Sequence, residues 1–190
     1  MKSNQLLINH YFSNNGTLTF LKSFFLILSG SLLLAVSSKV QVPFWPVPMT
    51  MQTFIVFLIG MTYGLKLSFL TLLAYILEGA FGLPVFASGS GLAYLMGPTA
   101  GYIYGMFFAG CVIGYLAEKG FSNSYFLSFL SLIFGSIIIF LLGVVYLGTI
   151  IGFDKALAAG LLPFIPSEFF KIALAVAIIP SVCKYTNKNN

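Results

Sequence analysis

The chain has 190 residues, of which 59% are hydrophobic and 7% are charged. A soluble domain carries about 25% charged residues, so the composition excludes an ordinary soluble domain and indicates a protein that crosses the membrane with several helices. The net charge of +5 comes from lysines scattered between hydrophobic blocks. Such lysines are expected to set the orientation in the membrane rather than to bind nucleic acid.

Six apolar segments are expected to form membrane-spanning helices. In chain order they run over about 20–38, 51–64, 67–82, 99–118, 125–148 and 168–185. A tight turn at Gly64-Leu65-Lys66 separates the second span from the third, and 153–165 is expected to form a further short helix at the membrane surface. The expected fold class is an all-α membrane protein, a six-transmembrane-helix bundle with outer loops capping a ligand pocket.

Polar segments are expected to flank this membrane domain. We expect a polar N-terminal leader at 1–19, a single six-helix membrane domain at 20–185 and a polar C-terminal tail at 186–190. The first apolar run follows Lys22 and reaches Ala35-Val36-Ser37, which loosely fits a signal-peptide cleavage site. The leader is long and polar for a signal peptide, so the run is interpreted as an uncleaved first span.

Lysine placement predicts the orientation of the bundle. If the N-terminus is cytoplasmic, the lysines divide between a larger cytoplasmic set and a smaller outer set. The cytoplasmic set is Lys2, Lys22, Lys66, Lys119, Lys184 and Lys188, and the outer set is Lys39, Lys155 and Lys171. Because cytoplasmic loops carry an excess of lysine, both the N- and C-termini are expected to be cytoplasmic.

Three connections on the expected outer side are rich in proline and glycine. Their sequences are VQVPFWPVPMTMQ, GLPVFASGSGLAYLMGPTAGY and a third that ends in PFIPSE. Proline and glycine at this density break helices, and irregular backbone close to a membrane is tolerated where it is buried in protein or lines a cavity. The connections therefore predict a lidded pocket open to the outside, with these polar residues nearby: Gln52, Thr53, Glu78, Glu168 and Lys171.

The charged pair Glu168 and Lys171 lies at the start of the expected last span. In a helix that begins near Ser167, the two residues are three apart and share a face. Opposite charges at membrane depth are costly unless they meet each other, water or a ligand, which makes the pair the first candidate for a binding site. In the alternative interpretation, Glu168 complements the helix N-terminus and Lys171 extends to the lipid head groups.

Small residues mark the expected helix contacts. Ser31, Ala35 and Ser38 form a stripe on the first span, and the fourth span carries two stripes, Gly101, Gly105 and Ala109 followed by Gly110 and Gly114. Such stripes let helices approach closely, and by default they are internal packing. If the stripe on the first span faces lipid, Ser31 and Ala35 would instead form a docking face for another subunit.

The sequence offers little for catalysis. Cys111 and Cys183 fall in apolar helical segments and are expected to be inert, and the one histidine, His10, lies in the leader. Neither a catalytic residue set nor a metal site is expected. The chain has no G-x-x-x-x-G-K-[ST] phosphate loop, so ATP-driven transport would need another protein.

Three segments together resemble the BioY family. They are PVPMTMQT at 46–53, GLPVFASGSGLAYLMGPTAG at 82–101 and PFIPSEFFK at 163–171. BioY proteins are the biotin-specific, substrate-binding S components of energy-coupling-factor (ECF) vitamin transporters, and the resemblance covers about 43–175. The family usually has aspartate at the position of Glu168, whereas Lys171 matches its lysine. Glutamate keeps the charge but reaches one methylene further.

The resemblance implies a six-helix bundle in a bacterial cell (inner) membrane, with biotin bound on its outer side. It also implies work with a transmembrane coupling subunit and ATP-binding subunits, and no cofactor beyond biotin as the transported substrate. Biotin offers a carboxylate, a ureido group with two N–H donors and one carbonyl, and an apolar ring with an alkyl tail. Lys171 can pair with the carboxylate, while Glu168, Glu78 or Gln52 can accept hydrogen bonds from the ureido N–H groups.

Aromatic side chains are expected to enclose the ring and tail of biotin. The candidates are Phe44, Trp45, Tyr75, Phe86 and Tyr102. For each of them core packing or an interface belt is an alternative, and for Glu78 the alternative is solvation at the outer end of the third span. The residues leave open which polar group meets which end of biotin.

Two other functional classes are weighed against this one. A stand-alone secondary transporter or channel for a small carboxylate solute predicts polar residues in midspan and inverted repeats, whereas these spans are nearly all apolar. An intramembrane enzyme predicts a nucleophile with its base, or a metal cluster. The expected function is therefore a non-enzymatic, solute-binding membrane subunit.

Overall fold

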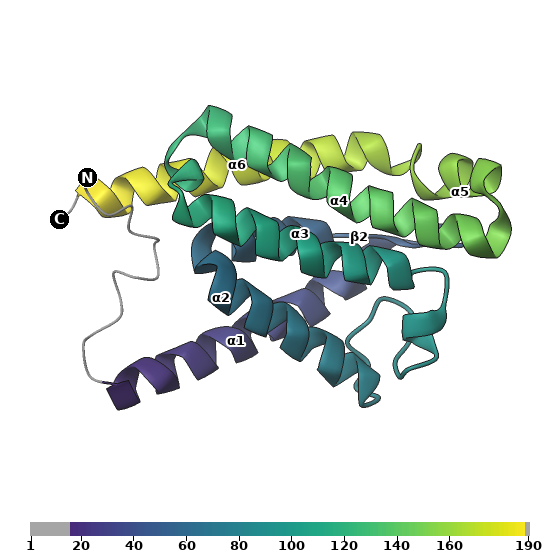
Figure 1. Ribbon diagram of the computed structural model, residues 1–190, viewed down its shortest axis with the longest axis horizontal. Helices are drawn as coiled ribbons and strands as arrows, with labels where there is room; N and C mark the ends of the chain where they lie inside the picture. Colours follow the sequence, from purple (N-terminus) through teal and green to yellow (C-terminus); the bar gives the residue numbers. More distant parts are fainter. Residues whose placement is uncertain (1–15, 189–190) are drawn as a thin grey trace.

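A computed structural model describes residues 16–188 of the chain as a bundle of helices with one short β-ribbon (Figure 1). The elements in chain order are α1 (Gly16–Lys39), β1 (Gln41–Val42), β2 (Met49–Thr50), α2 (Gln52–Ala80), the 3-10 turn η2 (Tyr94–Met96), α3 (Ala100–Glu118), the 3-10 turn η3 (Phe121–Asn123), α4 (Tyr125–Ile151), α5 (Phe153–Gly160) and α6 (Phe164–Lys188). The ribbon, in which Gln41 pairs with Thr50 and Val42 with Met49, was not expected from the sequence.

Five of the described helices are long and apolar enough to cross a membrane. These are α1, α2, α3, α4 and α6, so the chain is an all-α membrane protein, but the expected count of six spans is not confirmed. The difference lies in α2, a 29-residue helix that covers both the second and the third expected spans. Gly64 interrupts it with a φ of 76°, a conformation that glycine adopts at little cost.

The two arms of α2, 52–63 and 65–80, lie side by side. The Gln52 amide donates to the Tyr75 hydroxyl at 2.6 Å, and the Ser68 hydroxyl donates to the Ile59 carbonyl at 3.2 Å. In a straight helix residues 52 and 75 would be about 35 Å apart, so the helix must fold back sharply at Gly64. The break that the sequence predicted at Gly64-Leu65-Lys66 is thus confirmed. The two arms on either side of it together carry the single label α2.

A carboxylate from α3 stabilises this break. Glu118 accepts a hydrogen bond from the backbone N–H of Leu65 at 2.9 Å, which satisfies a free donor at the start of the second arm. Beside it, a Cβ on Gly114 would lie 2.7 Å from the Gly64 carbonyl. The glycine stripes on α3 are buried, as expected for internal packing.

The small residues of α1 face the second arm of α2. Ser31 is 1% exposed and its hydroxyl donates to Glu78 at 2.8 Å, and the buried Ser38 donates to the Val85 carbonyl at 2.8 Å. Ser31 thus packs against α2 within this chain, and its role as a docking residue stays a prediction. Ala35 is half-buried against the core, and its role as a docking residue stays a prediction.

The last span begins earlier than expected. α5 has eight residues, which confirms a short helix in 153–165, and α6 then starts at Phe164 rather than at 168. Pro166 fits in the first turn of α6, where its missing N–H costs nothing. Glu168 consequently lies in the second turn, so the interpretation that it complements the helix N-terminus is wrong.

The expected leader and tail lie largely outside the part of the chain that the structure describes. Residues 16–19 of the expected leader belong to α1, and residues 186–188 of the expected tail belong to α6. The remainder, 1–15 and 189–190, lies outside the described residues. The alternation of long apolar helices brings the connections 40–51, 81–99 and 152–163 to one end of the bundle, called here the loop end (Figure 1).

Candidate ligand-binding site

Hydrogen bonds from α1, β1 and α2 hold the irregular segment that follows α2. Lys39 donates to the Phe86 carbonyl and Gln41 donates to the Ala87 carbonyl at 3.4 Å. The Tyr75 hydroxyl donates to the Val85 carbonyl at 3.0 Å. Because this segment has no helix of its own at 81–93, these side chains satisfy its free carbonyls and fix its position over the bundle.

A cavity of about 50 Å³ lies under the loop end, lined by residues of the connections 40–51 and 81–99 and by the helices below them. We call it the loop-end cavity. It is lined by Val47, Pro48, Thr50, Gln52, Thr53, Tyr75, Phe86, Ala87, Tyr94, Thr99, Tyr102, Ile103, Met106, Ile139, Phe140, Phe164, Glu168 and Lys171. The lining is mostly apolar and aromatic with a few polar groups, which is the composition of a small-molecule site.

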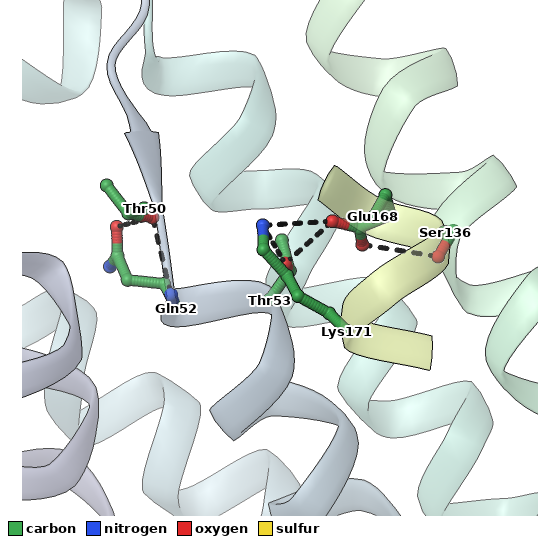
Figure 2. A network of polar contacts seen from close by, with 6 residues as sticks. All are labelled: Thr50, Gln52, Thr53, Ser136, Glu168 and Lys171. Carbon is green, nitrogen blue, oxygen red and sulfur yellow. Dashed lines mark hydrogen bonds and ion pairs between the residues drawn. The ribbon is translucent and has the colours of Figure 1, made fainter. Parts of the chain in front are cut away.

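The polar wall of the cavity is built around Glu168 and Lys171 on α6 (Figure 2). The Lys171 ammonium lies 3.1 Å from Glu168 Oε2 and donates to the Thr53 hydroxyl at 3.0 Å. Thr53 in turn donates to Glu168 Oε2 at 2.9 Å, and Ser136 of α4 donates to Oε1 at 3.3 Å. The network therefore ties together α2, α4 and α6.

This ion pair is buried: Glu168 is 4% exposed and Lys171 is 7% exposed. Removing two charges from water costs several kcal/mol for each ion, and their attraction offsets this only with good geometry and further hydrogen bonds. The Thr53 and Ser136 hydroxyls supply those bonds. The alternative that Lys171 extends to the head groups is wrong, because its ammonium is turned inward.

Aromatic rings form the opposite walls. Phe86 stacks on Tyr94 with ring centroids 5.0 Å apart and meets Tyr75 edge-on at 5.5 Å. Tyr102 stacks on Phe164 at 6.3 Å, and its hydroxyl donates to the Gly160 carbonyl at 2.8 Å. Since the Tyr75 and Tyr102 hydroxyls each have a hydrogen-bond partner, these two rings are held in place at the cavity wall.

Gln52 supplies an amide at the side of the cavity away from α6. Its Nε2 donates to Tyr75, and its Oε1 accepts from Thr50 at 3.1 Å. Figure 2 shows Thr50 and Gln52 on one side of Lys171 and Ser136 on the other. The cavity thus offers amide, hydroxyl, carboxylate and ammonium groups within one apolar enclosure.

The structure brings seven of the expected site residues together. They all line the loop-end cavity: Gln52, Thr53, Tyr75, Phe86, Tyr102, Glu168 and Lys171. Several further lining residues were not foreseen as a group, among them Tyr94, Thr99, Met106, Ile139 and Phe164. Nothing in a single sequence distinguishes these from ordinary packing residues, because their role depends on how each helix is rotated.

Three expected site residues lie elsewhere. Phe44 is 43% exposed and Trp45 is 85% exposed, and neither lines the loop-end cavity. Glu78 is bonded to Ser31 on the α1 side of the second arm, outside this cavity. The connection turns the indole outward, and the rotation of the helix turns the Glu78 carboxylate toward α1.

Metal-ligating side chains do not gather in the described part of the chain. Among residues 16–188, no group of three His, Cys, Asp or Glu side chains could hold a metal ion. Cys111 and Cys183 are free thiols in α3 and α6.

The family model of the BioY family matches residues 8–188. The chain belongs to the BioY family. A probable biotin transporter BioY of Pyrococcus horikoshii is 40% identical over 147 residues, covering 77% of this chain and 86% of the relative. A biotin transporter BioY of Thermotoga maritima is 40% identical over 148 residues, covering 77% of this chain and 86% of the relative.

A third relative, a probable biotin transporter BioY of Rickettsia prowazekii, is 34% identical over 170 residues and covers 89% of this chain and 87% of its own length. The fold is similar to that in a 2.1 Å crystal structure of the S-component for biotin from an ECF-type ABC transporter. That likeness has a TM-score of 0.78 at 24% identity and covers 91% of this chain and 95% of the other. These BioY relatives are transporters, in agreement with the expected non-enzymatic role.

Proposed function

We propose that this BioY protein is the biotin-binding S component of a vitamin importer. In this proposal it captures biotin at its outer face and delivers it inward with an ATP-driven coupling module. The observation that carries the proposal is the buried Glu168–Lys171 pair in an aromatic cavity beneath two of the loops. The names of the BioY relatives support biotin as the substrate.

The polar groups of the cavity suit the functional groups of biotin. An ammonium with an unused donor can bind the carboxylate, since Lys171 has three N–H donors and two of them serve Thr53 and Glu168. The ureido N–H groups can donate hydrogen bonds to carboxylate or amide oxygens, which Glu168 and Gln52 provide. The stacked rings of Tyr102 and Phe164 supply an apolar wall for the bicyclic ring.

The cavity must enlarge to hold this substrate. Its volume of about 50 Å³ is well below the roughly 300–1,000 Å³ of small-molecule sites. Its cover consists of loop residues such as Val47, Pro48 and Ala87, whereas its floor belongs to α2, α3 and α6. Binding is therefore expected to open the loop end while the floor keeps its geometry.

Lysine positions in the structure support an outward-facing loop end. Lys66 and Lys119 are exposed near the Gly64 break and the end of α3, at the end of the bundle opposite to the loop end. Lys39 and Lys155 lie at the loop end. Alkaline phosphatase fused after Lys155 should be active and phosphatase fused after Lys119 inactive; the reverse pattern would place the cavity on the cytoplasmic side.

The direct test is biotin binding to the purified chain, measured by calorimetry and compared with desthiobiotin, thiamine and riboflavin. A nanomolar dissociation constant corresponds to about −12 kcal/mol, which is under 1 kcal/mol for each of the roughly 16 heavy atoms of biotin and within reach of an enclosed site. Lys171→Ala should abolish tight binding, and Lys155→Ala, a change at an exposed lysine outside the cavity, should not. The proposal fails if the parent chain does not bind biotin at micromolar concentration.

The dependence on a coupling module needs a separate experiment. Because the sequence contains no phosphate-binding loop, uptake driven by ATP requires ATP-binding subunits from elsewhere. Purification in mild detergent from its source should retain a second membrane protein and ATP-binding subunits. If the chain purified alone still concentrates biotin in sealed vesicles, it works without such a module.

A further inference from the structure

Helices α5 and α6 lie alongside α4 (Figure 1), and a groove of about 490 Å³ runs between them. We call it the lateral groove. Along α4 it extends from Ile133 to Val145, which is about 18 Å of helix. Because α4 and α6 are both apolar enough to cross a membrane, the rim of the groove faces lipid. This rim consists of apolar side chains that are each at least 44% exposed: Ile137, Leu141, Val145, Leu157, Ile165 and Phe169.

The floor of the lateral groove includes two polar side chains, Ser136 and Glu168, which are 7% and 4% exposed. The Ser136 hydroxyl donates to Glu168 Oε1 at 3.3 Å, and Glu168 Oε2 accepts from Thr53 and Lys171. Every other side chain that lines the groove is apolar. Since both polar groups already have partners, and a polar ligand without a hydrogen bond would be costly to bury, the groove suits a purely apolar occupant.

The size of the groove prevents a transmembrane helix from entering it. A helix is at least about 10 Å across with its side chains, so over about 18 Å it would fill roughly 1,400 Å³, about three times the volume of the groove. A methylene chain whose carbons make contacts at about 4 Å is roughly 4–5 Å wide, and it fills about 300 Å³ over the same length. The volume of about 490 Å³ therefore accommodates one such chain.

The length of the groove also matches a lipid tail. The hydrocarbon core of a bilayer is about 30 Å thick, so the tails of one leaflet extend over about 15 Å, close to the length of the groove along α4. Leu157 of α5 and Ile165 at the start of α6 bound the groove, which places it next to the loop end. We propose that the lateral groove holds one acyl chain of a membrane phospholipid from the leaflet next to the loop end.

The acyl chain covers the lipid-facing side of the buried ion pair. Glu168 lines both the lateral groove and the loop-end cavity, so the groove is a second side from which water could reach its carboxylate. Water at this place would weaken the attraction between Glu168 and Lys171, because it raises the local dielectric constant. The bound chain thus completes the enclosure of the pair between α4 and α6. The assignment does not depend on biotin binding, so it can be tested on the chain without that ligand.

The test counts the phospholipid that the full chain retains after purification in a mild detergent, by native mass spectrometry. We expect about one phospholipid per chain for the parent. Leu141→Trp at the rim and Val144→Phe at the floor add ring atoms inside the groove, and each should reduce the retained phospholipid about tenfold, the effect of overpacking a filled site. Leu130→Trp is the matched control and should keep the phospholipid, since Leu130 is 44% exposed on the same helix but does not line the groove.

Thermal unfolding gives an independent readout. Phospholipid added back to the delipidated chain should raise the Tm of the parent and of Leu130→Trp by several degrees, because a ligand of the native state stabilises it by mass action. The increase should be less than half as large for Leu141→Trp and Val144→Phe. The proposal is overturned if the parent retains no phospholipid, if either groove variant retains as much as Leu130→Trp, or if Leu130→Trp loses it as well. A dimeric parent that Leu141→Trp but not Leu130→Trp converts to a monomer would assign the groove to a second copy of the chain and would likewise overturn it.

Discussion

Removal of one charge from the Glu168–Lys171 pair should destabilise the protein even without a ligand. In Lys171→Met the Glu168 carboxylate stays at 4% exposure with no cation beside it. Breaking a buried pair typically costs about 3–5 kcal/mol. Because Thr53 and Ser136 still donate to Glu168 at 2.9 and 3.3 Å, we expect a value near the lower limit, about 3 kcal/mol.

A double-mutant cycle shows whether the two charges act together. Glu168→Gln leaves the ammonium with Thr53 as its partner, and we expect a loss of about 2 kcal/mol. The double variant contains no buried charge, so its loss should be about 2 kcal/mol rather than the sum of about 5, which gives a coupling of about 3 kcal/mol. Replacing a buried ion pair by neutral side chains is often nearly neutral for this reason.

Thermal unfolding followed by circular dichroism in detergent is the assay. For a chain of this size about 1 kcal/mol corresponds to 2–4 °C in Tm, so Lys171→Met should lower Tm by roughly 6–12 °C. Lys155→Met is the control, because Lys155 is exposed on α5, and its change should stay within about 0.5 kcal/mol. A double variant whose Tm falls by the sum of the two single changes would refute the coupling that the geometry indicates.

Three further changes address the cover, the carboxylate reach and the helix packing. Trp45→Ala should alter the Kd for biotin less than about threefold by calorimetry, since the indole is 85% exposed and an exposed ring contributes little to a ligand; a tenfold loss would assign it a ligand contact. Glu168→Asp should weaken biotin binding less than Glu168→Ala, because it keeps the charge while shortening the reach to Ser136; equal losses in calorimetry would contradict this. Gly105→Ala would place a Cβ 2.8 Å from the Ile139 backbone and should cost about 1–3 kcal/mol in thermal unfolding; an unchanged Tm would show that α3 and α4 separate easily.

Several features of the fold follow from local sequence. The apolar segments predicted all the long helices, and the turn at Gly64 was predicted because a helix break depends mainly on neighbouring residues. The three loops rich in proline and glycine were recognised for the same reason. The pairing of Glu168 with Lys171 was foreseen as well, since two residues three apart on a helix are neighbours whatever surrounds them.

Other assignments depended on where side chains lie in the packed structure, which no local sequence pattern reveals. The sequence alone treated Glu78 and Trp45 like Gln52, because all three lie near the loop connections. Only the packed structure turns Glu78 toward Ser31 and Trp45 outward, and only it brings Ser136 of α4 against Glu168. These outcomes depend on the rotation of each helix about its axis.

The sequence by itself thus determined the membrane class of this BioY protein, its helix breaks and the charged pair on α6. The tertiary structure decided which faces of those helices meet. The start of α6 at Phe164 shows the difference: it moves Glu168 from a helix end into the second turn, where Thr53 and Ser136 from two other helices reach its two oxygens. Hydrophobicity and turn chemistry act over a few residues, whereas a binding site is set by contacts among residues more than 100 positions apart, such as Thr53 with Glu168 and Lys171.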